Sequence, residues 1–333
     1  MKPYTPITAS LLAILWLCAF PINALAAPRA CVATDFTAFL QAFSQSLDVQ
    51  RQASTGRVFS TTVEVAGDSA QPRVRVLHGD ELALPMMPAI ADSGMTGVEV
   101  QRIDPRHVRV DDKRAGNEAI KAYLFEYAEC WTLVAMEDWS VDERRLTLSG
   151  RPDMSRAEEI CYLKSGIFQG LGGVERYPPT TEFFEAALQN KLCAAASGNP
   201  QASLEAVSLG FSGMAPALSA ELNEKLLTRA AETLPVAAAL LARFYCNGTD
   251  DTRDGPCLDP ARAEAMLIKS VKMGGWETLP MLASHYEQGD LQGRDLSRAL
   301  ACYQLAREKG VEGYVDSVQR LRDQGAVPGA ACY

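Results

Sequence analysis

Two stretches of this chain, LARFYCNG at residues 241–248 and LASHYEQG at residues 282–289, carry Leu, Ala, Tyr and Gly at the same internal spacing. Farther along, DPARA at residues 259–263 recurs as DLSRA at residues 295–299. The first pair is offset by 41 residues and the second by 36, so the earlier unit carries five extra residues in the connection after its glycine. Self-similarity at such a period is typical of a solenoid built from stacked supersecondary units.

The recurring residues suit a helical hairpin. Ala and Leu allow two helices to approach closely. Gly248 and Gly289 can adopt the positive φ at which a first helix ends. Asp259 and Asp295 can cap the start of a second helix. Because one hairpin cannot bury its apolar face alone, the pattern predicts a right-handed stack of hairpins with a concave face.

These residues resemble the Sel1-like repeat, a relative of the tetratricopeptide repeat. Its pattern is L-A-x-x-Y-x-x-G, a short loop, D-x-x-K/R-A, and a second helix that ends at Gly. Residues 236–275 and 279–311 match well, residues 199–234 match weakly, and residues 155–197 are interpreted as a further divergent helix pair. The resemblance implies an all-α solenoid over residues 155–333, whose concave face binds another protein.

Residues 31–150 have a different pattern, which predicts an α+β domain with a helix packed on an antiparallel sheet. Thr34 or Asp35 can cap a helix over residues 34–51, where apolar residues recur at helical spacing. Segments rich in β-branched residues then predict strands: RVFSTTVEV, PRVRVLH, TGVEVQRI, HVRVDD and AIKAYLFEYAECWTLVAMEDWSV. The opening DFTAFLQAF and the late YLFEYAECWTLVAMEDWS resemble cone-shaped domains of the nuclear-transport-factor-2-like type.

The first residues have the layout of a secretory signal peptide. One early lysine is followed by a mainly apolar run over residues 7–20, and residues 24–26 form a small-x-small cleavage site. We expect residues 1–26 to be removed, with cleavage after Ala26 or Ala27. The alternative, a membrane anchor, needs a longer apolar run. The mature chain is then expected to be periplasmic or secreted, in a bacterial envelope, with no membrane span.

Nine cysteines are present, and Cys18 lies in the signal segment. The remaining eight are an even number in an oxidising compartment, which predicts disulfides. Cys246 and Cys257 flank the lengthened polar connection, so a bridge between them would hold two helix ends together. The four expected pairs are Cys246–Cys257, Cys161–Cys193, Cys302–Cys332 and, by elimination, Cys31–Cys130.

The same connection has a rival interpretation as a calcium loop. Asp250, Thr252, Asp254 and Gly255 follow the order of the first ligand positions in such a loop. Position twelve, which should supply a bidentate Glu, is Ala261. We therefore favour a solvated loop that is held by its disulfide.

No catalytic, cofactor-binding or metal-binding motif is present in the sequence, so we expect neither an enzyme nor a cofactor. His107 and His285 stand alone, and His78 with Asp80 lacks a serine placed by a motif. The chain has 41 acidic and 32 basic residues, a formal charge of −9. This charge argues against nucleic acid as a partner.

The expected function is protein–protein interaction, as an adaptor or scaffold for an unknown protein or extended peptide. In a Sel1-like solenoid the first helix of each hairpin lines the concave face, and its variable positions point into it. These candidate contacts are Arg243, Phe244, Ser284, His285, Glu287 and Gln288. Two alternatives stay open: an immunity-type inhibitor of an exported toxin, and small-ligand binding or enzymatic activity in residues 31–150.

Overall fold

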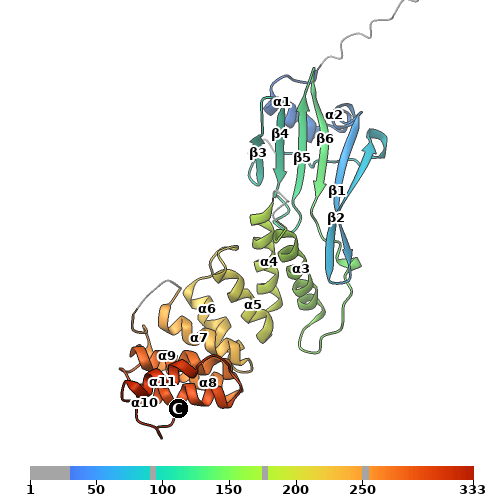
Figure 1. Ribbon diagram of the computed structural model, residues 1–333. Coiled ribbons are helices and arrows are strands. Elements are labelled where there is room, and N and C mark those ends of the chain that lie inside the picture. The colour runs from blue at the N-terminus through green and yellow to red at the C-terminus, as the bar shows by residue number, and fades with distance from the viewer. Residues whose placement is uncertain (1–30, 91–94, 175–178, 250–254) are drawn as a thin grey trace, which may run out of the picture.

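A sheet with two short helices occupies one end of the molecule, and a curved stack of helices occupies the other (Figure 1). The structure is a computed structural model that describes residues 31–90, 95–174, 179–249 and 255–333. The signal segment and most of the proposed calcium loop, from Asp250 to Asp254, lie outside the described residues. Among the described helices, none is long and apolar enough to cross a membrane.

The helix expected over residues 34–51 is two helices, α1 (Phe36–Gln45) and α2 (Leu47–Ala53). Asp35 caps α1, because its carboxylate accepts a hydrogen bond from a backbone N–H of the first turn at 2.9 Å. Ser46 interrupts the helical pattern with an extended backbone, φ −125° and ψ 119°. Its hydroxyl caps α2, so a local side-chain hydrogen bond overrides the continuous apolar periodicity.

In the described part of the chain, six strands form one sheet in the order β2-β1-β6-β5-β4-β3. The strands are β1 (Arg57–Ala66), β2 (Ser69–His78), β3 (Val98–Arg102), β4 (His107–Asp112), β5 (Lys121–Tyr127) and β6 (Trp131–Asp138). Four neighbouring pairs are antiparallel as expected, but β1 and β6 run parallel. The sheet is mixed because a β1–β2 hairpin joins a β3–β6 meander through strands that point the same way.

Aromatic side chains fill the space between α1 and the sheet. Phe36, Phe39 and Phe43 of α1 are buried against Phe125 of β5 and Trp131 of β6. Ring centroids are 5.1 Å apart for Phe43 and Phe125 and 4.8 Å apart for Phe36 and Trp131, both edge-to-face. Aromatic quadrupoles favour this geometry. The space between α1 and the sheet is therefore a packed core.

Beyond residue 155 the described chain is helical. The helices are α3 (Arg156–Gly172), α4 (Thr180–Ala194), α5 (Pro200–Phe211), α6 (Ala220–Ala230), α7 (Pro235–Asn247), α8 (Pro260–Lys272), α9 (Leu279–Gln288), α10 (Leu296–Glu308) and α11 (Val315–Asp323). Successive helices from α3 to α10 pack as hairpins, of which α7–α8 and α9–α10 are the two clear repeats (Figure 1). The expected fold class, an α+β part followed by a Sel1-like solenoid, is confirmed.

The recurring glycines and aspartates lie where the repeat pattern predicts. Gly248 and Gly289 end α7 and α9 with φ 69° and 86°, a region that other residues rarely adopt. Asp259 and Asp295 cap α8 and α10, each accepting a hydrogen bond from the backbone N–H three residues farther on. Local chemistry therefore sets where each helix of a hairpin ends and begins.

A second set of recurring residues links each repeat to the one before it. In the later repeat, the Glu264 carboxylate on α8 accepts a hydrogen bond from the Tyr286 hydroxyl on α9 at 2.6 Å and pairs with Arg298 on α10 at 2.9 Å. The Arg298 guanidinium also lies over the Tyr286 ring, 4.0 Å from its centroid. Burial, together with the Glu264 carboxylate, raises the pKa of Tyr286, so its hydroxyl stays protonated and donates.

The earlier repeat contains the same arrangement in a more exposed form. Tyr245 donates to Glu224 at 3.1 Å, Arg262 pairs with Glu224 at 2.7 Å, and the Arg262 guanidinium lies 4.2 Å from the Tyr245 ring centroid. The Glu224 side chain is 40% exposed, whereas the Glu264 side chain is 10% exposed. The two networks therefore share a geometry, but water screens the Glu224 network more strongly.

The eight described cysteines form four disulfides, in the pairs that the sequence analysis expects. These are Cys31–Cys130, Cys161–Cys193, Cys246–Cys257 and Cys302–Cys332. The first ties the segment before α1 to the turn between β5 and β6, and the second joins α3 to α4. The third bridges the end of α7 to the residues before α8, and the fourth fastens the C-terminal tail to α10.

The sheet and the first helical hairpin share one core. Trp139, just after β6, packs edge-to-face on Phe183 of α4 with ring centroids 5.2 Å apart. Both belong to a buried cluster that runs from the sheet into α7. At the same junction Lys113 forms an ion pair with Glu182 of α4 at 2.5 Å. A domain boundary between residues 150 and 155 remains a prediction, and we expect the parts on either side to unfold together.

We expect the stability of the fold to depend on pH through Glu158, which lies in the first turn of α3. Hydrogen bonds from Ser197 and Ser155 hold the pKa of Glu158 at about 2, below its ordinary value of 4.5. Because the folded-state pKa is depressed, this stabilisation is present above the unfolded-state pKa and is lost as the pH falls toward 2. Glu158→Gln should therefore lower the Tm at pH 7 and have progressively less effect below pH 4.5.

The control is Glu221→Gln, which changes an exposed glutamate in the first turn of α6. Thermal unfolding of both variants is followed by circular dichroism at several pH values. A Tm loss for Glu158→Gln that is the same at pH 7 and at pH 2.5 would contradict the assignment.

The two inter-repeat networks predict unequal effects of equivalent mutations. Glu264→Ala removes the shared acceptor of Tyr286 and Arg298 at a buried site, which we expect to cost about 2–4 kcal/mol in the free energy of unfolding. Glu224→Ala removes the equivalent, more exposed carboxylate and should cost about 1 kcal/mol or less. Urea unfolding of both variants measures the difference, and equal losses would show that burial does not decide the strength of the network.

Candidate interaction surface

A hollow of about 270 Å³ opens on the solenoid between α5 and α7. Half-buried Phe211 and Leu240 give it an apolar wall, and exposed Ser208 and Ser212 give it a polar rim. Ser208 lies in the last turn of α5, and Ser212 lies just after it. The repeat pattern matches only weakly here, so the sequence did not predict where this helix ends. The hollow suits an apolar side chain of a partner, with hydrogen-bonding groups at its edge.

Arg243 and Phe244 both line this hollow, but they differ in exposure. Arg243 is exposed and lies at the rim. Phe244 is 9% exposed and packs near the ring of Tyr245, with centroids 6.1 Å apart. Of these two expected contacts, Phe244 is thus mainly a wall of the hollow, and Arg243 is the more exposed one.

All four candidates on α9 interact within the protein. The Gln288 amide donates to the Ser284 hydroxyl at 3.2 Å. Glu287 forms a two-point ion pair with Arg320 of α11, one contact of which measures 3.1 Å. The helix α11 therefore covers part of the face that the repeat pattern predicts to be open. Because Glu287 and Arg320 are 33 positions apart in the chain, the repeat pattern does not reveal their ion pair.

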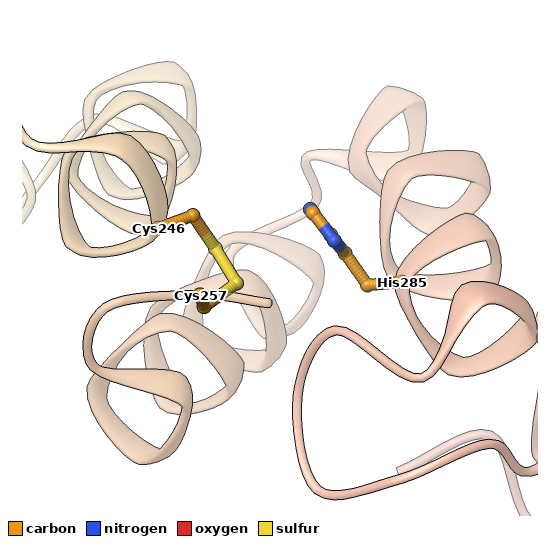
Figure 2. Close-up of side chains that lie close together, drawn as sticks. All are labelled: Cys246, Cys257 and His285. Carbon is orange, nitrogen blue, oxygen red and sulfur yellow. A yellow bond between two sulfur atoms is a disulfide. The ribbon is translucent and has the colours of Figure 1, made fainter. Parts of the chain in front are cut away.

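The fourth candidate on α9, His285, lies beside the Cys246–Cys257 disulfide (Figure 2). Its ring nitrogen Nδ1 is 3.1 Å from a carboxylate oxygen of Asp290. The structure therefore groups His285 with these cysteines and places it outside the lining of the hollow that contains Arg243.

The inter-repeat networks contain residues that the sequence analysis did not single out. Arg262 and Arg298 are the Arg of DPARA and DLSRA, so their recurrence was visible in the sequence. Glu224 and Glu264 precede their tyrosine partners by 21 and 22 residues, a spacing that a search for short motifs does not detect. The tyrosines and arginines of the repeat are therefore packing residues that hold the hairpins in register.

A larger hollow, of about 770 Å³, lies beside α2 and the end of β2. Its lining combines Arg51, His78 and Asp80 with the apolar side chains of Leu82 and Leu84. His78 and Asp80, which the sequence placed close together, thus share one wall. Thr55 and Gly79 complete the lining, so the hollow offers both polar and apolar contacts.

No family model matches the sequence, and no curated protein matches it. Among the solved structures that are similar over part of the chain are two repeat proteins. One is a Sel1 repeat protein from Oxalobacter formigenes, at 20% identity and a TM-score of 0.38, over 48% of this chain and 62% of that chain. The other is c5321, a protective antigen present in uropathogenic Escherichia coli strains that displays an SLR fold, at 16% identity and a TM-score of 0.37, over 51% of this chain and 38% of that chain.

This chain spans less than two thirds of the length of either neighbour. Both neighbours are described as Sel1 or SLR-fold proteins. The helical part of this chain is a solenoid of stacked hairpins, and α7–α8 and α9–α10 carry the residues that resemble the Sel1-like repeat. The resemblance of residues 31–150 to nuclear-transport-factor-2-like domains is not confirmed.

Proposed function

We propose that this protein is an exported scaffold that binds another protein or an extended peptide through its solenoid. The observation that carries the proposal is the hollow between α5 and α7, where an apolar wall meets the exposed residue Arg243. Protein interfaces combine a buried apolar contact with a polar rim, and Arg is enriched in them. A partner would insert an apolar side chain beside Phe211 and present a carboxylate or a carbonyl to Arg243.

The proposed location is the periplasm or the exterior of a bacterial cell. The signal-peptide pattern at residues 1–26 and the four disulfides support it, because disulfides persist in oxidising compartments. The repeat scaffold supports a role without catalysis. An immunity-type inhibitor of an exported toxin is a special case of this proposal, in which the partner is the toxin.

A second candidate function rests on the hollow beside α2. Its volume of about 770 Å³ and its mixed lining of Arg51, His78 and Leu82 suit a small polar ligand. The space under α1 is a packed aromatic core, which supports this outer position for a ligand of the N-terminal part. The two hollows are far enough apart in the fold to be tested separately, since one lies beside the sheet and the other in the solenoid.

The test begins with affinity capture from the envelope fraction, using the mature protein as bait, and continues with a charge reversal in each hollow. Arg243→Glu should weaken binding of a captured partner by about tenfold, or 1.4 kcal/mol, because it reverses the charge at the rim. Arg51→Glu should leave that affinity unchanged. Calorimetry gives the dissociation constants, and the Tm of each variant shows that the fold is intact.

The opposite result, with Arg51→Glu weakening binding and Arg243→Glu neutral, would move the site to the hollow beside α2. If neither variant changes the affinity for any captured protein, the proposed binding surface is wrong.

A further inference from the structure

Two successive repeats bring Cys246, Cys257 and His285 together. Cys246 lies in the last turn of α7, Cys257 lies shortly before α8, and His285 lies on α9. One potential ligand atom from each, two sulfurs and a ring nitrogen, all lie within 4.8 Å of one another. Figure 2 shows the His285 ring extending from its helix toward the bridge between the cysteines. No other such group of three occurs among the residues that the structure describes.

The backbone holds this cluster in place independently of the sulfur–sulfur bond. The Cys257 N–H donates to the carbonyl of Asp290 at 3.0 Å, which ties the cysteine to the end of the His285 helix. The N–H of Leu258 donates to the carbonyl of Cys246 at 3.0 Å. The next residue caps α8, and so the backbone on either side of Cys257 is fixed. Reduction of the disulfide would therefore leave both sulfurs facing His285.

Asp290 orients the histidine as a ligand. Its carboxylate lies 3.1 Å from Nδ1 of His285, a geometry in which Nδ1–H donates and the lone pair of Nε2 is available. Metal-binding histidines usually donate their other ring N–H to a carboxylate in this way. Cys246 and Cys257 are 3% and 7% exposed, and the His285 side chain is 22% exposed, so a metal here would be largely shielded from water.

We propose that Cys246, Cys257 and His285 form a zinc site that becomes available when the Cys246–Cys257 disulfide is reduced. Two thiolates and one neutral imidazole are ligands that Zn²⁺ prefers, at about 2.3 Å for sulfur and about 2.0–2.1 Å for nitrogen. Three protein ligands leave a fourth position for water or for a side chain of a partner. The charge of the two thiolates balances that of Zn²⁺.

The required steps balance with a dithiol as the reductant. The dithiol transfers two electrons and two protons to the disulfide, which yields two thiols and an oxidised dithiol. Zn²⁺ then binds both sulfurs and releases the two thiol protons to solvent. The Cys246–Cys257 pair thus has two alternative states, a disulfide and a zinc site, and both hold α7 to α8.

The experiment uses the whole mature chain, reduced with a phosphine, desalted and mixed with Zn²⁺. Competition with a chromogenic chelator measures the affinity, and Co²⁺ in place of Zn²⁺ reports sulfur coordination by its absorption. The reduced protein should bind one tight Zn²⁺, and the oxidised protein should bind none at this site. His285→Ala and Asp290→Asn should each weaken binding by roughly 10–100-fold.

Two matched controls isolate the site. Cys161→Ser with Cys193→Ser removes another disulfide of the solenoid and should keep the tight Zn²⁺, whereas Cys246→Ser with Cys257→Ser should lose it. His78→Ala changes a histidine in the N-terminal part and should have no effect.

Zinc affinity that is unchanged in His285→Ala, or absent from the reduced protein, would overturn the proposal. If reduction lowers the helix content, Zn²⁺ should restore the circular dichroism of the wild type and not that of His285→Ala. Equal recovery in both proteins, or recovery in neither, would overturn it as well.

Discussion

The solenoid depends on a carboxylate that each repeat supplies to the next. Glu264 lies on the second helix of one hairpin, and it is buried only when Tyr286 and Arg298 of the following hairpin cover it. A buried carboxylate without partners would be strongly unfavourable, so the same contact that stabilises the stacked arrangement disfavours any other register. The Ala and Leu side chains allow the helices to pack closely, but apolar contacts alone tolerate a shift of one helix along another. The hydrogen bonds and the ion pair of Glu264 specify one register.

The same stacking continues into the sheet. The Trp139 ring rests on Phe183, and apolar residues of the sheet and of α3 to α7 form one buried cluster. The sheet therefore covers the end of the first hairpin that would otherwise be exposed. A solenoid needs such a cap at each end. At the other end α11 and the tail held by Cys302–Cys332 close the last repeat. The hollow at α5 and α7 and the cysteine–histidine cluster lie between these caps.

Covering the ends also changes which side chains remain accessible. Glu287 lies at a position of the repeat that would face a partner, yet Arg320 of α11 occupies it. His285 lies beside a disulfide, because Cys246 and Cys257 flank the lengthened connection of the previous repeat and bring their bridge next to it. Arg243, by contrast, belongs to a repeat in the middle of the stack and borders an open hollow. A position in the repeat therefore acquires its role from the neighbours that stack on it.

The sequence by itself determined the features that local chemistry decides: the helical repeat, the ends of its helices at Gly248 and Gly289, the caps at Asp259 and Asp295, and the strands of the first half. These depend on backbone freedom, on capping hydrogen bonds and on side-chain periodicity within a few residues. The break at Ser46 is also local, because its hydroxyl caps α2, but the continuous apolar periodicity hides it. Only the tertiary structure decided the parallel β1–β6 pair and the contact of Glu287 with Arg320. Both features depend on contacts between residues that are far apart in the chain. A pattern within a few residues cannot reveal such contacts.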